Sequence, residues 1–258
     1  MNNISKNAVV SPKTKLGDNI TIKDFAVIED DVILKDNIIV GTNALICSGS
    51  RIGSNNQIFH SAVLGSIPQD LKFKGEPTTL EIGDGNIFRE FVTISRGTTY
   101  RNKTVIGNNC FLLAYVHVPH DSIIGNNVII SNAVNMGGHV VIDDWVNIGG
   151  MVGIHQFVRI GEHSFIAFLS RVTQDVPPYI LAGGNPINYK GLNIIGLKRR
   201  GFKEDVINKI KQAYTLIYNS KYNISDALKA VKEFIEPIEE VKKIINFIET
   251  SERGIIRR

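Results

Sequence analysis

Large aliphatic residues recur at every sixth position from Val10 to Val172. Of the 28 positions in this series, 24 hold Val, Ile, Leu or Met, so the spacing does not arise by chance. An amphipathic helix would repeat every 3.6 residues and a half-buried strand every two, and neither period fits. The pattern predicts short strands joined by tight turns, with one large side chain per strand in a shared core. Glycine often follows the aliphatic residue, where it would supply backbone conformations that other residues resist.

This period resembles that of the hexapeptide-repeat family, whose chains wind into a left-handed parallel β-helix with three hexapeptides per coil. The handedness is implied by the resemblance, because the usual crossover rule for parallel strands would give the opposite hand. With 18 residues per coil, the stretch from Val10 to Asp175 predicts about nine coils. Their inward residues stack into one core, so no coil is stable by itself.

Two stretches interrupt the period and are predicted to leave the column as loops. Residues 66–79 place Asp70 and Glu76 at positions of the series, and residues 96–103 place Tyr100 at another. Loops on a regular scaffold often carry functional residues, although a neutral surface insertion remains the alternative.

The period ends at the prolines of residues 174–179, and the remaining chain has the pattern of helices. Residues 203–218 place apolar side chains on one face, Ser225 is a predicted N-cap, and Pro237 is predicted to open a last helix. We therefore expect a mainly β protein in two parts. These are a β-helix over residues 1–185 and a small C-terminal α-helical domain over residues 186–258.

Charge and composition restrict the class of partner. The net charge is +4, and the segment from Lys190 onward carries 15 Lys and Arg against 9 Asp and Glu. This excess suits a local anion site, or a solvated helical face, better than a nucleic-acid footprint, which needs a basic stripe with aromatics. Two cysteines without metal-ligand spacing, no leader-like N-terminus and no apolar run of about 18 residues predict a cytoplasmic protein without a membrane span.

Four of the six histidines lie between Leu112 and Phe157, and the 18-residue coil predicts that they share one edge. Residues 18 apart stack at about 4.8 Å, which places His120 below Gly138 and Asp121 below His139. We interpret His120 as a general base and Asp121 as the carboxylate that orients it, because imidazole exchanges protons near neutral pH. The backbone N–H of Gly138 would then face a developing oxyanion.

Two other interpretations of these histidines remain open. One is a row of solvated side chains, and the other is a metal site, since neutral imidazoles are good zinc ligands. The reach from His120 to His155 is nearly two coils, or roughly 10 Å, which is too long for one ion within one chain. No Ser or Cys is an evident covalent nucleophile. Direct transfer between two bound substrates, without metal or cofactor, is therefore favoured.

Six motifs resemble the UDP-N-acetylglucosamine acyltransferases of lipid A biosynthesis, and the resemblance covers essentially the whole chain. The motifs are HVPHDSIIGNN, GGHVVIDD, IGGMVGIHQFVRIG, QDVPPY, GLKRRGF and SERGIIRR. The resemblance implies transfer of an (R)-3-hydroxyacyl chain from acyl carrier protein to the 3-position of UDP-N-acetylglucosamine, the first step toward lipid A and lipopolysaccharide. It also implies a homotrimer with sites between neighbouring chains.

The resemblance assigns roles to individual residues. His120 matches the general base, Asp121 its partner and Gly138 the oxyanion donor. Phe168 matches the position that measures acyl length, where a phenyl ring predicts a shorter chain than the longest in the family. Ile195 stands where a glutamate is expected, which predicts the loss of one ribose contact. The implied substrate-binding residues are Gln69, Asp70, Lys72, His117, His139, His155, Gln156, Asn193, Arg199 and Arg200.

Three other functions compete with this one. The first is an N-acyltransferase for a 3-amino nucleotide sugar, which usually has an extra N-terminal domain for which a repeat starting at Val10 leaves no room. The second is a metal-dependent hexapeptide hydratase, and the third is a non-catalytic scaffold. A scaffold would not need the histidine edge, the QDLK loop and the KRR segment together.

Overall fold

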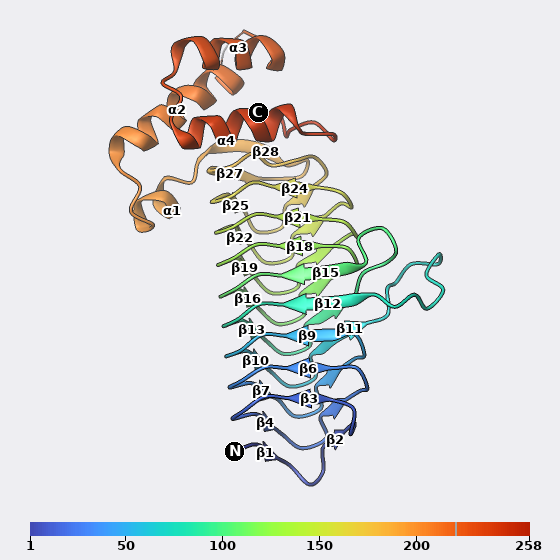
Figure 1. Cartoon of the computed structure of the whole chain (residues 1–258). Coiled ribbons are helices and arrows are strands. Elements are labelled where there is room, and N and C mark those ends of the chain that lie inside the picture. Colours follow the sequence, from blue (N-terminus) through green and yellow to red (C-terminus); the bar gives the residue numbers. More distant parts are fainter. Residues whose placement is uncertain (220) are drawn as a thin grey trace.

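The chain forms one long column of short strands with a group of helices at its C-terminal end (Figure 1). This computed structural model describes residues 1–219 and 221–258. Successive strands pass in turn through three sheets, so a strand pairs with those three places before and after it in the chain. The result is a left-handed parallel β-helix, which confirms the predicted fold class.

Most strands contain two residues, and the pairs within the column are parallel. Sheet A comprises β1 (Asn3–Ile4), β4 (Thr21–Ile22), β7 (Ile39–Val40), β10 (Gln57–Ile58), β13 (Ile87–Phe88), β16 (Phe111–Leu112), β19 (Ile129–Ile130), β22 (Asn147–Ile148), β25 (Phe165–Ile166), β27 (Ile180–Gly183) and β28 (Asn188–Leu192). Sheet B comprises β2 (Val9–Val10), β5 (Val27–Ile28), β8 (Leu45–Ile46), β11 (Val63–Ser66), β14 (Thr93–Ser95), β17 (His117–Val118), β20 (Asn135–Met136), β23 (Gly153–Ile154) and β26 (Arg171–Val172). Sheet C comprises β3 (Lys15–Leu16), β6 (Ile33–Leu34), β9 (Ser50–Ile52), β12 (Thr79–Ile82), β15 (Lys103–Ile106), β18 (Ile123–Ile124), β21 (Val141–Ile142) and β24 (Arg159–Ile160).

The core of the column consists of the aliphatic residues that recur every six positions. From Ile22 to Val172 these side chains are buried. Val10 and Leu16 are only partly buried, because they belong to the first coil and no coil covers them from below. Burying each such side chain contributes about 1.5–3 kcal/mol, so stacking of neighbouring coils stabilises the column.

The prediction that the glycines after these residues supply unusual backbone conformations is wrong for most of them. Gly41 and Gly137 lack a positive φ, and a Cβ on either would lie 2.7 Å from a backbone nitrogen of the next coil. Glycine is therefore required by close approach. The left-handed conformation falls on other turn residues, such as Asn37 (φ 58°), Asp121 (φ 58°) and His139 (φ 65°).

These left-handed turn residues recur every 18 positions and form the three edges of the column. In the upper half of the column, the first edge contains Asp121, His139 and Phe157, the second contains Asn127, Trp145 and His163, and the third contains Ala133, Met151 and Leu169. A side chain on one edge is separated by a sheet from side chains on the other two.

Two loops leave the column where the period is interrupted (Figure 1). Across the first, Leu64 pairs with Ile94, 30 residues later, so this loop adds 12 residues to a coil of 18. Across the second, Ile94 pairs with Val118, 24 residues later, so this loop adds six. The excursions between strands are residues 67–78 and 96–102, within one residue of the predicted bounds at each end.

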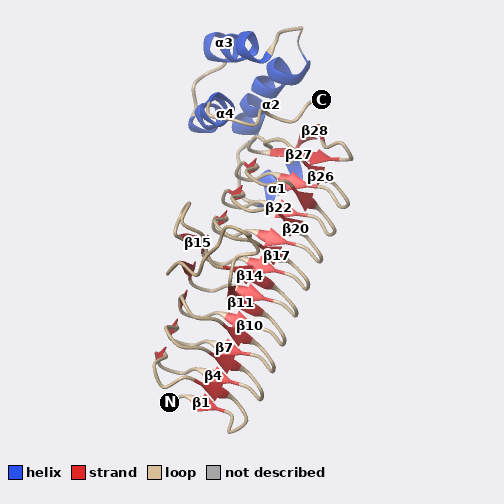
Figure 2. Ribbon diagram, turned by 90° about the vertical axis from the view of Figure 1, so that its right-hand side faces the viewer, coloured by secondary structure: helices blue, strands red, loops and turns tan. Residues whose placement is uncertain are grey.

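The helical group follows the antiparallel β27–β28 hairpin and covers the end of the column (Figure 2). It consists of α1 (Ile194–Arg199), α2 (Glu204–Asn219), α3 (Ile224–Phe234) and α4 (Glu239–Glu249). The predicted division between residues 185 and 186 lies in the turn of the hairpin and stays a prediction. In the described part of the chain, none of the helices has the length and apolar character needed to cross a membrane.

The helix ends differ in part from prediction. The predicted apolar face of α2 is confirmed, since Ile210, Tyr214 and Ile217 are buried. Ser225 is not an N-cap: Oδ1 of Asn223 accepts the N–H of Asp226 at 2.9 Å and caps α3. Asparagine caps as well as serine does, so composition did not distinguish the two positions. Helix α4 begins at Glu239, two residues after Pro237.

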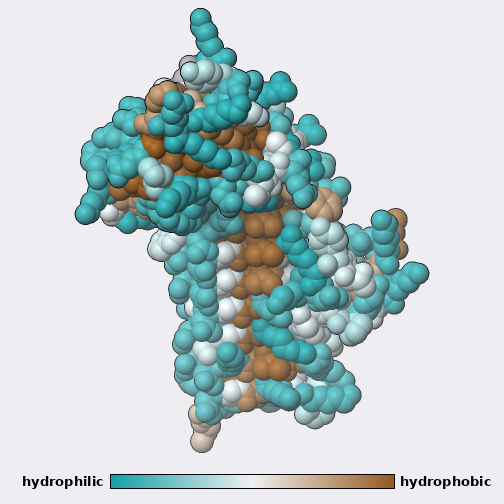
Figure 3. All heavy atoms as spheres, turned by 45° about the horizontal axis from the view of Figure 1, so that its top comes forward, coloured by the Kyte–Doolittle hydropathy of each residue, from teal (hydrophilic) through white to brown (hydrophobic). Residues whose placement is uncertain are grey.

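An apolar band runs along the column and ends beneath the helices (Figure 3). The exposed large apolar side chains include Ile39, Ile123 and Ile129, which occupy outward positions of their strands. Ile39 and Ile129 lie on sheet A and Ile123 lies on sheet C. Exposed apolar surface along the column is of the kind that often contacts another protein.

Candidate active site

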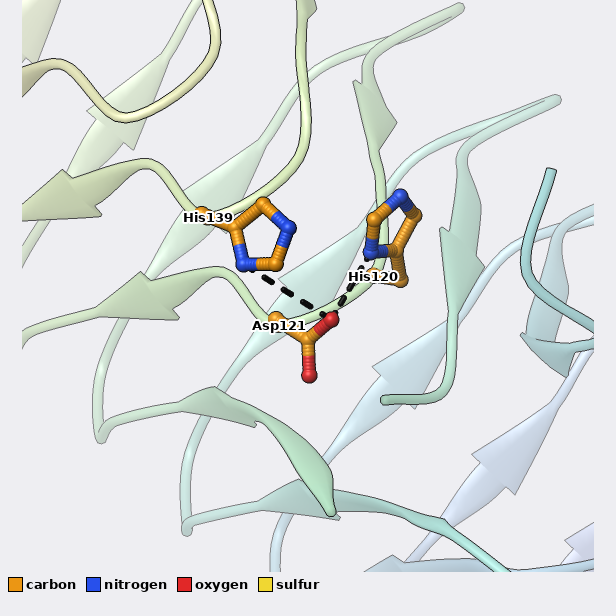
Figure 4. Close-up of side chains that lie close together, drawn as sticks. All are labelled: His120, Asp121 and His139. Carbon is orange, nitrogen blue, oxygen red and sulfur yellow. Dashed lines mark hydrogen bonds and ion pairs between the residues drawn. The ribbon is translucent and has the colours of Figure 1, made fainter. Parts of the chain in front are cut away.

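His120 and Asp121 lie at the turn after β17, on the first edge (Figure 4). Nδ1–H of His120 donates a hydrogen bond to Oδ2 of Asp121 at 2.8 Å, and the Asp121 side chain is fully buried. Because the acceptor is a carboxylate, Nδ1 must carry the proton, and the neutral ring then has its lone pair on Nε2. Nε2 of His120 is therefore the atom that can take a proton from a substrate.

The carboxylate of Asp121 is held by the second loop, residues 96–102. Its Oδ1 accepts the backbone N–H groups of Thr98 at 3.0 Å and Arg101 at 3.1 Å, and its Oδ2 accepts the hydroxyl of Thr98 at 2.6 Å. Burial raises the pKa of Asp121, but the hydrogen bonds from Thr98, His120 and Arg101 outweigh it and bring the pKa below its ordinary value. The carboxylate therefore stays charged beside His120.

Gly138 lies against the ring of His120. A Cβ at this position would lie 2.6 Å from Cε1 and 2.8 Å from Nε2 of His120, so only glycine fits beside the imidazole. The residue is buried, and its N–H makes no hydrogen bond to any residue in the described ranges 1–219 and 221–258. Buried backbone N–H groups without a partner are rare, and this one suits a developing oxyanion.

His139 packs against His120 and Asp121 from the next coil. Its ring lies 5.0 Å from that of His120, stacks on Phe157 at 4.3 Å and meets Tyr100 edge-on at 4.5 Å. Burial lowers the pKa of His139, and the nearby charge of Asp121 offsets this only in part. Its Nδ1 has no hydrogen-bond partner among the described residues and lies 3.8 Å from Oδ2 of Asp121.

His120, Asp121 and His139 also meet the distance requirement of a metal site, since one ligand atom from each lies within 4.8 Å of the others. The donor set fits an ion poorly, because each oxygen of Asp121 already accepts two hydrogen bonds. An ion on this carboxylate would have to displace Thr98, Arg101 or His120. The base interpretation of His120 uses the same contacts without displacing any of them.

His117 and His155, which were also predicted on this edge, and the predicted substrate contact Gln156 differ in their surroundings. Nδ1 of His117 lies 2.7 Å from the hydroxyl of Thr93, and burial, with a smaller contribution from His120, lowers the pKa of His117. His155 and Gln156 are exposed, nearly two coils above His120. Their side chains are accessible to a substrate that extends along the edge.

A cavity of about 260 Å³ lies between the two loops and the first edge. Its lining includes Asp70 and Lys72 from the first loop, Tyr100 from the second, and His139. Asp70 and Lys72 are thus brought beside the histidines, whereas Gln69 is exposed and is not part of the lining. Oδ1 of Asp70 accepts the N–H of Lys72 at 2.9 Å, which closes the loop into a tight turn.

Asn193 lies beside the second edge. Its Oδ1 accepts the N–H of Gly196 at 3.2 Å and caps α1, and its Nδ2 donates to the carbonyl of His163 at 2.9 Å. The amide that sequence similarity assigns to the nucleotide therefore also fixes α1 to the column.

Arg199 and Arg200 end α1 beside the same edge. The guanidinium of Arg200 lies 5.4 Å from the Trp145 ring centre, and its Nη1 lies 3.4 Å from Nδ1 of His163. Arg199 and Ile195 are exposed, Ile195 at 68%. Within one chain, these residues do not meet the histidines of the first edge.

Phe168 lies next to the third edge and is 59% exposed. Its ring atom Cδ2 would lie 3.5 Å from a Cβ at Gly150, so the ring covers the glycine one coil below. The predicted catalytic, nucleotide and acyl residues thus lie at three different edges.

Thr98 and Arg101, which donate hydrogen bonds to the Asp121 carboxylate, were not predicted from the sequence. The interruption of the period at Tyr100 identifies the loop. No spacing indicates that the loop folds back onto a residue 20 or more positions later, because the loop itself has no period.

The column and the base–carboxylate pair on its edge define the class of hexapeptide-repeat transferases. The family described as bacterial transferase hexapeptide (six repeats) matches residues 103–138, which include His120, Asp121 and Gly138. The second domain of the family described as UDP N-acetylglucosamine O-acyltransferase matches residues 175–256.

Full-length relatives make the assignment more specific. An acyl-[acyl-carrier-protein]–UDP-N-acetylglucosamine O-acyltransferase of Thermodesulfovibrio yellowstonii is 42% identical and covers 100% of both chains. Its counterpart in Trichlorobacter lovleyi is 49% identical over 98% of this chain and 99% of its own. A UDP-N-acetylglucosamine acyltransferase structure from Bacteroides fragilis matches with a TM-score of 0.96 at 48% identity, covering 98% of this chain and 99% of that one. This chain belongs to the UDP-N-acetylglucosamine O-acyltransferase family.

Proposed function

We propose that this enzyme transfers an (R)-3-hydroxyacyl chain from acyl carrier protein to the 3-hydroxyl of UDP-N-acetylglucosamine, the first step of lipid A biosynthesis. The relatives named above act on acyl carrier protein and UDP-N-acetylglucosamine, and they match this chain over its whole length. The observation that carries the chemistry is the bond from Nδ1 of His120 to Asp121, which leaves Nε2 free beside Gly138.

In the reaction, Nε2 of His120 removes the proton of the sugar hydroxyl as its oxygen attacks the thioester carbonyl. The charge of Asp121 stabilises the imidazolium, and the N–H of Gly138 stabilises the oxyanion of the tetrahedral intermediate. When the intermediate collapses, the carbon–sulfur bond breaks and His120 returns the proton to the thiolate of the carrier protein. The products are the ester and the free thiol, and no cofactor is consumed.

Binding of the two substrates is assigned to residues around this centre. Asp70 and Lys72 line the cavity together with His139 and suit the sugar and the acyl hydroxyl. Gln69, the exposed residue before Asp70, is assigned to the same substrates by its sequence match. His117, His139, His155 and Gln156 provide polar contacts along the first edge. Asn193, Arg199 and Arg200 are assigned to the nucleotide, because guanidinium groups donate paired hydrogen bonds to phosphate.

A homotrimer resolves the separation between these groups. The KRR segment lies at the second edge and His120 at the first, so one substrate reaches both when the edges of two neighbouring chains face each other. The apolar band along the column (Figure 3) supplies a surface for that contact. We place the trimer in the cytoplasm, with residues 1–185 building the column and residues 186–258 the helical domain.

The product and the acyl length are tested together. The purified enzyme is given UDP-N-acetylglucosamine with a ladder of 3-hydroxyacyl carrier proteins, and the products are identified by mass spectrometry. A single 3-O-acyl product is expected, with the shorter acyl chains favoured because a phenyl ring occupies the position matched to acyl-length selection, and Phe168→Gly should extend the range. A wild-type preference for the longest chain would contradict the role of Phe168, and transfer only to a 3-amino sugar would identify the alternative N-acyltransferase.

A further inference from the structure

Thr98 is the residue of the second loop whose side chain contacts the carboxylate of the catalytic pair. The Thr98 hydroxyl donates to Oδ2 of Asp121 at 2.6 Å and accepts the N–H of Tyr100 at 3.2 Å. A hydroxyl has one hydrogen, so the contact from Tyr100 leaves that hydrogen directed at the carboxylate. Thr98 is 7% exposed and Asp121 fully buried, so water does not compete for this bond.

The same carboxylate oxygen receives both the Thr98 hydroxyl and Nδ1–H of His120. The direction in which Oδ2 faces His120 therefore depends on Thr98. Without that hydroxyl the carboxylate keeps its two backbone contacts on Oδ1, but Oδ2 keeps only the bond from His120. The imidazole keeps its acceptor, but Oδ2 is no longer fixed in position by a second donor, so the bond that holds the His120 proton on Nδ1 and the lone pair on Nε2 is less well oriented.

We propose that Thr98 is a positioning residue for the transfer reaction, which acts through Asp121 to hold His120 in its reactive tautomer and orientation. This inference rests on the proposed role of His120. Thr98 also lines the cavity beside His139, but its hydroxyl is engaged by Asp121 and the N–H of Tyr100, so loss of the hydroxyl should affect the chemical step rather than binding.

The loop is anchored independently of the Thr98 hydroxyl. Backbone N–H groups of Arg96 and Gly97 donate to Ser66 at 2.9 Å and Thr79 at 3.1 Å. Near the C-terminal end of the loop, the Arg101 guanidinium donates to the backbone carbonyl of Asp121 at 3.1 Å. Removing one hydroxyl should therefore leave the loop in place.

The test is a double-mutant cycle with Thr98→Val and His120→Ala. In the wild-type background, Thr98→Val should lower kcat about 10- to 100-fold while KM for either substrate changes less than about threefold. Thr98→Ser, which keeps the hydroxyl, should restore most of the rate. In the His120→Ala background, Thr98→Val should have no further effect, because the group it positions is gone.

Thr104 provides the matched control. It follows the same loop, is fully buried, and its hydroxyl has no partner among the described residues. Thr104→Val makes the same chemical change without touching Asp121, and it should leave kcat unchanged. The melting temperature of each variant is also measured. Thr98→Ala replaces Thr98→Val if the Thr98→Val protein does not assemble.

The outcomes separate the two claims. If His120→Ala is nearly as active as wild type, the proposed catalytic role of His120 fails. If His120→Ala is inactive but Thr98→Val keeps the wild-type kcat, the positioning role of Thr98 is wrong. The role is also wrong if Thr98→Val lowers kcat by the same factor in the His120→Ala background as in the wild type. Loss of rate in Thr98→Val without rescue by Thr98→Ser would also overturn it.

Discussion

Two partly buried histidines on neighbouring edges of the same column have opposite surroundings. On the first edge, His120 donates to the carboxylate of Asp121 at 2.8 Å. On the second edge, His163 lies 3.4 Å from the guanidinium of Arg200 and stacks between Trp145 and Tyr179. The scaffold and the side chain are the same, and the charged partner differs.

The partner decides what each imidazole can do. A carboxylate stabilises the imidazolium that forms when His120 takes a proton. Burial lowers the pKa of His163 to about 4, and the charge of Arg200 adds to this effect. Nη1 of Arg200 can donate to Nδ1 of His163 only when that nitrogen is unprotonated. His163 is thus a neutral support for Arg200 and the helical group, whereas the surroundings of His120 suit the role of base proposed for it.

The largest effect that this comparison predicts is on the rate. His120→Ala removes the base and should lower kcat by about 10²–10⁴-fold, whereas His163→Gln should lower it less than about tenfold. Steady-state kinetics with both substrates measures the two variants. Equal losses would show that the two edges do not differ in the way that their partners indicate.

Gly138→Ala tests the surroundings of the base without changing its partner. The added methyl would lie 2.6 Å from the His120 ring and so displaces either the imidazole or the Gly138 N–H. A loss of about 10²–10³-fold in kcat is expected. Gly153→Ala is the control, since a Cβ there meets nothing within 4 Å. Wild-type activity in Gly138→Ala would contradict the proposed role of the Gly138 N–H as the oxyanion donor.

Mixing two variant chains tests whether the two edges meet between protomers. Arg199→Ala should raise KM for the nucleotide sugar about tenfold or more, as expected for a lost charge-assisted hydrogen bond. Trimers assembled from His120→Ala and Arg199→Ala chains should contain some sites with both residues intact, and they should recover activity at low sugar concentration. If no mixture exceeds its parents, the edges do not meet between chains.

The smallest effect concerns stability in acid. In the unfolded chain the His163 ring has its ordinary pKa of 6.5 and is protonated below it, whereas burial lowers the pKa of His163 to about 4 in the folded protein. Between pH 6.5 and 4 the folded state therefore binds fewer protons than the unfolded state. The stability that neutral His163 contributes is complete above pH 6.5 and is lost as the pH falls toward 4. His163→Gln should show a shallower fall in melting temperature between pH 7.5 and 5. An unchanged slope would show that His163 does not titrate as its surroundings indicate.

The period of six allowed the column, its core and the positions of both loops to be predicted, because every coil obeys the same stacking constraint. Counting in steps of 18 also predicted that Gly138 lies beside His120 and His139 beside Asp121. The contacts of Thr98 and the cap at Asn223 were not predictable in this way. Loops and helix ends depend on local side-chain geometry, which no repeat records.

The two ends of the column have different consequences for assembly. At the N-terminal end, Ile4 and Val9 of the first coil are 41% and 62% exposed. At the other end, α2 to α4 cover the last coils, and Ile255 near the C-terminus bridges to Asp175. Unpaired strand edges template the addition of further strands, as in amyloid. An unlimited fibre, however, needs two complementary open ends on every subunit. Because the helices cover one end of the column, each subunit has at most one end that could accept another strand, and end-to-end addition cannot continue into a fibre.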